Sequence, residues 1–77
     1  MTDDDKALLD FAEKWWRQAG AQHDAIDREL GLTPTRYFQR LNALLDDPEA
    51  LAYSPQLVRR LQRIRSQREA GRRARRA

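Results

Sequence analysis

Arginine is concentrated at the C-terminal end of this 77-residue chain. Residues 56–77 carry nine arginines against Glu69 alone, a formal charge of +8, whereas residues 1–55 carry six basic and eleven acidic side chains, a formal charge of −5. The guanidinium group stays charged, is weakly hydrated and binds phosphate oxygens in pairs. The net charge of +3 therefore hides a strongly basic arm on a mildly acidic body, and the arm predicts an anionic partner.

Seven arginines of the arm are predicted to contact phosphates: Arg59, Arg60, Arg63, Arg72, Arg73, Arg75 and Arg76. Like charges four residues apart, such as Arg59 and Arg63, destabilise a free helix, and this cost favours nucleic acid as the partner. Two alternatives stay open. The arm could pair with carboxylates of the body such as Asp10, Glu13 or Asp24, or it could bind an acidic protein surface.

A helix, a glycine turn and a second helix are predicted between Gln22 and Leu45. Gly31 permits the reversal because it has no Cβ, Thr33 is a candidate N-cap, and Pro34 suits the first helical position. This spacing is typical of a helix-turn-helix, whose second helix enters the major groove of DNA. A plain helical hairpin would show the same pattern.

The second of these helices has an apolar and a polar face on a helical wheel. The apolar face contains Tyr37, Phe38, Leu41, Leu44 and Leu45. The polar face is predicted to meet DNA bases through Thr35, Arg36, Gln39 and Arg40. Arginine can pair with guanine and glutamine with adenine, although the two arginines could equally bind phosphates. Asp27 stands where a small residue is usual, and Asp46 and Asp47 would repel phosphate at the helix end.

No segment alternates apolar and polar residues in the way a strand does, so the expected fold class is all-α. The predicted helices span about residues 3–19, 22–30, 34–46 and 55–70, with a capped single turn at 47–52. Thr2 is the expected N-cap of the first helix, Gly20 its stop, and Gly71 the stop of the last. We expect a compact four-helix domain at residues 1–70 and an arginine-rich tail at 71–77 that is disordered when free.

The last helix should dock on the body through Leu57, Leu61 and Ile64. Trp15 is expected in the core and Trp16 at its edge, because adjacent helical positions diverge by about 100°. An exposed Trp16 would mark a protein interface.

Several stretches of the chain resemble a known family. They are Trp15-Trp16 followed by Ala19-Gly20-Ala21, the run from Thr35 to Asn42, and Pro48-Glu49-Ala50-Leu51. Together they resemble a family of small basic actinobacterial proteins known as a domain of unknown function, over nearly the whole chain. The resemblance implies a helix-turn-helix-like fold. The helix-turn-helix segment also resembles, more weakly, the DNA-binding region of bacterial sigma factors, from which Asp27 departs.

The residues expected of an enzyme or a metal site are missing from the sequence. There is no cysteine, His23 is the lone histidine, and no nucleophile–base pair or glycine-rich phosphate loop can be recognised. We therefore expect no enzyme activity, metal or cofactor. The acidic start of the chain is unlike a signal peptide and no apolar run could span a membrane, so we expect a cytoplasmic, nucleoid-associated protein.

The sequence thus predicts a double-stranded DNA-binding protein, either a small transcription regulator or a nucleoid-associated protein, for which a homodimer would strengthen binding. One alternative is a protein-interaction module that docks on RNA polymerase, a sigma factor or another regulator through Trp16, Tyr53 and apolar rims. Another is a protein that binds structured RNA through the arginines alone. The target sequence and the choice between activator and repressor are not encoded in any pattern.

Overall fold

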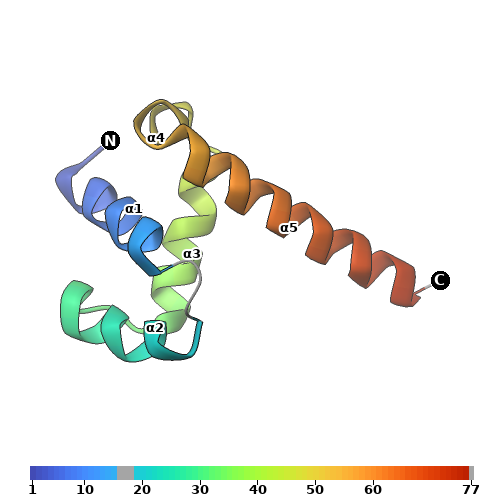
Figure 1. The fold of residues 1–77 in the computed structure, drawn as a ribbon, viewed down its shortest axis with the longest axis horizontal. Coiled ribbons are helices and arrows are strands. Elements are labelled where there is room, and N and C mark those ends of the chain that lie inside the picture. The colour runs from blue at the N-terminus through green and yellow to red at the C-terminus, as the bar shows by residue number, and fades with distance from the viewer. Residues whose placement is uncertain (16–18, 77) are drawn as a thin grey trace.

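The computed structural model describes the backbone of residues 1–15 and 19–76 and the side chains of residues 1–15 and 22–73. Helices make up nearly all of this part of the chain, and it contains no strand (Figure 1). The elements are α1 (Asp3–Trp15), α2 (Ala19–Ala25), a π-helical turn η1 (Ile26–Leu30), α3 (Pro34–Leu44), α4 (Pro48–Tyr53) and α5 (Pro55–Arg76). The predicted all-α fold class is therefore confirmed.

Short polar side chains start three of the helices. The Asp5 amide donates to Thr2 Oγ1 at 3.1 Å and the Thr2 amide donates back to Asp5 Oδ2 at 3.2 Å, which forms a reciprocal capping box at α1. At the start of α3, Thr33 Oγ1 accepts from the Arg36 amide at 3.2 Å. At the start of α4, Asp47 Oδ1 accepts from the Glu49 amide at 2.9 Å. The N-caps predicted at Thr2 and Thr33 are confirmed.

The core lies between α1, the junction of α2 and η1, α3, α4 and the first turns of α5. Its buried side chains are Leu8, Leu9, Phe11, Ala12, Ala25, Ile26, Tyr37, Leu41, Leu44, Leu45, Ala50, Leu57 and Val58. Tyr37 of α3 is fully buried, and its ring meets Phe11 of α1 edge-on at 5.4 Å between centroids. Trp15 was expected in the core but is only half-buried against this cluster, whereas Trp16 lies outside the described residues.

The helix α5 begins beside the C-terminal end of α3 and then leaves the body (Figure 1). Leu57 and Val58 are buried, Leu61 and Ile64 are half-buried, and every described side chain from residue 66 to residue 73 is exposed. Gln62 Nε2 also donates to the Leu45 carbonyl at 2.7 Å. The predicted docking of α5 through its apolar stripe is confirmed for its first three turns, and the remainder projects into solvent.

Gly20 does not end a helix as predicted. The structure describes α1 as far as Trp15 and α2 from Ala19 to Ala25, so Gly20 lies within a helix. Glycine costs about 1 kcal/mol relative to alanine within a helix, and alanines 19 and 21 on either side favour the helix. The glycine alone is therefore a weak stop signal.

The C-terminal end of the fold also differs. The prediction that Gly71 ends the last helix is wrong, because α5 continues to Arg76, and residues 71–76 are helical rather than an unstructured tail. Arginine and alanine are strong helix formers and surround this glycine. The turn predicted at residues 47–52 is a helix, α4, so the described part of the chain holds five α-helices rather than four.

Candidate nucleic-acid interface

The turn before α3 fixes how that helix is presented. η1 is followed by Gly31, which has φ 65°. The Gly31 amide donates to the Asp27 carbonyl at 2.9 Å. This left-handed conformation favours glycine, as the sequence predicted. Asp27 itself faces solvent and makes no ion pair within the described residues. The small residue buried in this region is Ala25, so the carboxylate that departs from the usual pattern does not interrupt the packing.

Three of the four predicted base-facing side chains lie together on the outward face of α3. Thr35, Arg36 and Gln39 are exposed in its first two turns, opposite the buried Tyr37 and Leu41. Within the described residues Arg36 makes no ion pair. This face can offer a guanidinium, an amide and a hydroxyl group to a partner, which are the groups that read base edges.

Arg40, the fourth predicted base-facing residue, is held by α1. Its side chain is half-buried, and its Nη2 donates to Asp5 Oδ1 at 3.3 Å. The pKa of Asp5 lies below its ordinary value, chiefly because the Thr2 amide donates to its carboxylate. The Thr2 hydroxyl and Arg40 lower this pKa further, whereas burial raises it. The helical wheel placed Arg40 on the polar face, but that edge of the face packs beside α1.

The arginines of α5 fall on two sides of the helix. Arg59, Arg63 and Arg73 lie on the side away from the apolar stripe, are exposed, and make no ion pair within the described residues. We call these three residues the outer arginine face, and each of them is exposed to solvent.

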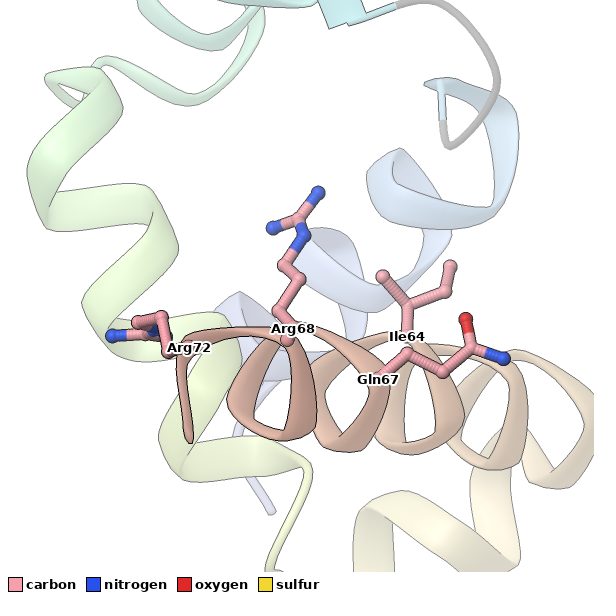
Figure 2. A pocket seen from close by; sticks show the side chains of 5 residues that line it. Ile64, Gln67, Arg68 and Arg72 are labelled. Atoms are coloured by element: carbon pink, nitrogen blue, oxygen red, sulfur yellow. The ribbon is translucent and has the colours of Figure 1, made fainter. Parts of the chain in front are cut away.

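Two other arginines continue the apolar stripe of α5. Leu61, Ile64, Arg68 and Arg72 follow one another at steps of three or four, so they share one side of the helix. Figure 2 shows Ile64 and Arg68 extending from the same side of α5. Arg72 was predicted to bind phosphate together with Arg73, but the two lie on different sides of the helix.

Three further arginines were predicted to contact phosphates. Arg60 is half-buried and interacts within the protein. Arg75 and Arg76 belong to the last turn of α5, but their side chains lie outside the described residues.

One arginine of α5 has a function that the sequence did not reveal. Arg65 donates from Nη2 to Asp46 Oδ1 at 2.9 Å and from Nη1 to Asp46 Oδ2 at 3.3 Å, and Nη1 also donates to Asn42 Oδ1 at 3.0 Å. The hydrogen bonds from Arg65 hold the pKa of Asp46 below its ordinary value. Asp46 was expected to repel phosphate, but the guanidinium compensates its charge. The spacing of Arg65 from Leu61, one turn earlier on the docking side, is the sequence signal that points to this pair.

A groove lies between the middle of α3 and the projecting part of α5. Its volume is about 520 Å³, and Phe38, Leu41, Leu61 and Ile64 form its apolar lining. Phe38 was placed on the apolar face of α3, but 43% of it is exposed in the groove beside α5. The exposed His23 ring meets Phe38 edge-on at 6.2 Å between centroids.

The other residues singled out in the sequence make ordinary contacts. Tyr53 is 42% exposed, and its hydroxyl donates to Asp10 Oδ1 at 2.9 Å, a hydrogen bond that raises the pKa of Tyr53. Among the side chains that the structure describes, no group of histidines and carboxylates could hold a metal ion. Within the same part of the chain, no helix is both long and apolar enough to cross a membrane.

Comparison with known proteins gives a family and no activity. The family described as "Protein of unknown function (DUF3263)" matches residues 1–73. Searches of the curated proteins and of the solved structures found no match. The match covers almost the entire chain, and the chain therefore belongs to the DUF3263 family.

Proposed function

We propose that this protein binds double-stranded DNA, as a small transcription regulator or a nucleoid-associated protein. The observation that carries the proposal is the outer arginine face of α5, where Arg59, Arg63 and Arg73 are exposed and make no ion pair within the described residues. Keeping like charges on one helix surface costs free energy. Phosphates would offset that cost and release condensed counterions on binding.

Three carboxylates of the body support this reading because they are engaged by other side chains. Asp5 pairs with Arg40, Asp46 pairs with Arg65, and Asp10 accepts from Tyr53. Of the partners considered for the arm from the sequence, Asp10, Glu13 and Asp24, none forms an ion pair with α5 within the described residues. The body thus leaves the outer arginine face available to an external anion.

The outward face of α3 and the outer arginine face would have different roles in DNA binding. The outward face of α3 has only Arg36 as a described exposed arginine, beside Thr35 and Gln39, so it would add little general affinity and could discriminate between bases. In this proposal α2, η1 and α3 act as a helix-turn-helix, and α5 binds the flanking phosphates. Contacts with phosphate fix the position of a protein on the duplex but do not select a sequence.

A mobility-shift assay with a pool of random duplexes at about 50 mM salt tests the proposal, because phosphate contacts are strongest at low salt. We expect a complex that structured RNA displaces less well than duplex DNA. No complex at this salt, or preferential displacement by RNA, would contradict DNA binding.

Variants separate the two surfaces in the same assay. Gln39→Ala or Arg36→Ala should change which duplexes are retained, at about 1–3 kcal/mol of discrimination for a good base contact. Arg59→Gln with Arg63→Gln should weaken binding to all duplexes by a similar factor. Equal losses on every sequence for both sets of variants would rule out base reading by α3.

A protein-binding role is the second candidate, and the exposed Phe38 in the groove favours it. Such a module could dock on RNA polymerase, a sigma factor or another regulator. The sequence suggested Trp16 and Tyr53 for this contact. Trp16 lies outside the described residues, and the Tyr53 hydroxyl donates a hydrogen bond to Asp10.

A further inference from the structure

The groove between α3 and α5 has an apolar lining that the described side chains leave uncovered. Phe38 contributes from α3, and Leu61 and Ile64 contribute from α5. Phe38 is the most exposed of the large hydrophobic side chains in the described part of the chain, at 43%. Aromatic side chains that stand in a hollow beside aliphatic neighbours are frequent anchor points for a partner.

The rim of the groove is positively charged on its α5 side. Arg68 and Arg72 follow Ile64 at steps of four, so they share its side of the helix, and both line the groove with it. They are exposed and make no ion pair within the described residues. Glu69 is the single acidic residue in the lining, so the rim favours an occupant that carries carboxylates or phosphates.

The combination of lining and rim distinguishes between the possible occupants. A nucleic-acid backbone would satisfy Arg68 and Arg72 but would leave Phe38 and Ile64 without an apolar cover. A second copy of α5 would place its own arginines against these two, and unpaired like charges at an interface cost affinity. An acidic amphipathic helix meets both requirements, because one of its faces is apolar and its flanks are negative.

The length of the α5 side of the groove matches that of a short helix. The stripe from Leu61 to Arg72 spans twelve positions of α5, or about 17 Å along the helix axis, which corresponds to about three turns of an occupying helix. Docking of a helix in a groove through residues at steps of three and four is a common mode of peptide recognition.

We propose that the groove between α3 and α5 docks an acidic amphipathic helix of a partner protein. Its apolar stripe covers Phe38, Leu61 and Ile64, and its carboxylates pair with Arg68 and Arg72. The outer arginine face points away from this groove, so the proposal does not depend on DNA binding and the two sites can be tested separately.

The probe is a synthetic helical peptide of about 18 residues, long enough to form helix in water. Leucines form one stripe, and glutamates flank it on both sides. The first control peptide has the same composition in a scrambled order, and the second has glutamine in place of each glutamate. Binding to the full chain is measured by fluorescence anisotropy and located by amide chemical-shift changes. We expect micromolar affinity for the probe and at least about tenfold weaker binding of both controls.

Variants of the protein locate the site. Phe38→Ala should weaken binding of the probe about tenfold, as expected for an aromatic anchor, and we expect the variant to fold because 43% of this side chain is exposed. Arg68→Gln with Arg72→Gln should weaken it about threefold or more and reduce its salt dependence. The matched control is Arg59→Gln with Arg63→Gln, which removes the same charge from the outer arginine face and should change binding less than about twofold.

Each contrary result overturns the proposal. The probe could fail to bind, the scrambled peptide could bind as tightly, or the two double variants could lose affinity equally. If duplex DNA, and not the peptide, shifts the amide signals of Phe38 and Ile64, the groove belongs to a nucleic-acid surface. If sedimentation shows a dimer that Phe38→Ala dissociates, a second copy of the chain is the occupant.

Discussion

At the scale of single residues, the arginines show what determines whether a guanidinium is paired inside the protein. Arg40 and Arg65 face the body, are half-buried, and each finds a carboxylate within 3.3 Å. Arg59, Arg63 and Arg73 face solvent and find none within the described residues. Position on the helix, and not the number of acidic residues in the chain, therefore decides which arginines remain available to a partner.

The Arg65–Asp46 pair predicts a measurable change in acidity. Because hydrogen bonds from Arg65 lower the pKa of Asp46, Arg65→Gln should raise that pKa toward its ordinary 3.8. A lowered carboxyl pKa stabilises the folded state above the ordinary pKa, and the contribution is lost as the pH falls through the folded-state value. Titration of Asp46 by side-chain NMR checks this. Arg63→Gln is the control and should leave the pKa of Asp46 in place; an equal change in both variants would contradict the assignment.

The buried Tyr37 predicts sensitivity to alkali. Burial raises the pKa of Tyr37 to about 12, against the opposing hydrogen bond from Gln22 Nε2 at 3.5 Å. Folding favours the neutral phenol, so its contribution is complete below pH 10 and is lost as the pH rises through 12, by about 3 kcal/mol in total. Denaturant unfolding between pH 9 and 12 should show a weaker pH dependence in Tyr37→Phe than in Tyr53→Phe. Identical pH profiles for the two variants would show that Tyr37 is not the responsible group.

At the scale of elements, two glycines have opposite effects. Gly31 has φ 65° and no atom within 4 Å of an added Cβ, so a side chain there would strain the backbone without a steric clash. Gly71 also has open space around an added Cβ but lies inside α5.

Alanine substitutions distinguish these roles. Gly31→Ala should lower the free energy of unfolding by about 1–2 kcal/mol, because it forces a left-handed conformation on an L-residue. Gly71→Ala should leave global stability nearly unchanged and increase the helix content of α5, since alanine is favoured by about 1 kcal/mol within a helix. Chemical denaturation and far-UV circular dichroism measure the two effects. A destabilising Gly71→Ala would mean that this residue does not lie within a helix.

Element boundaries could be predicted from sequence where a side chain or a φ angle enforces them. Thr2, Thr33 and Gly31 mark helix ends through a hydrogen bond or a left-handed conformation, and all three were predicted. Gly20 and Gly71 were misread, because inside a helix glycine carries only a modest penalty that its neighbours offset.

The candidate site could be predicted only in part for a related reason. A helical wheel gives the direction of a side chain but not the neighbour it meets. It therefore placed Thr35 and Gln39 outward, as observed, but could not show that Arg40 meets α1 or that Phe38 stays uncovered beside α5.

At the scale of the whole molecule, the protein is a small helical body with a projecting arm, 41 × 28 × 19 Å in extent (Figure 1). The body holds the buried core, whereas α5 beyond residue 65 has only exposed side chains among those described. Folding therefore does not depend on the part of α5 beyond residue 65, which carries Arg73 of the outer arginine face.

Truncation tests this separation. A chain that ends after Arg65 keeps Leu57, Val58, Leu61 and the Arg65–Asp46 pair, so it should unfold cooperatively within about 1 kcal/mol of the full chain, as expected when only exposed positions are removed. Duplex binding at low salt should fall by at least about tenfold, because several phosphate contacts disappear. Denaturation and mobility-shift assays check the two outcomes. Loss of folding would place part of the core beyond residue 65.

The claim that the outer arginine face binds DNA phosphates is tested most directly by the salt dependence of duplex binding. Each phosphate contact adds about 0.9 to the slope of log K against log salt concentration. Replacing Arg59, Arg63 and Arg73 with glutamine should therefore reduce the slope by about 2–3 on every duplex. The control, Gln39→Ala, should leave the slope unchanged. A slope that the triple replacement does not alter, or the absence of any complex at about 50 mM salt, would contradict the proposed function.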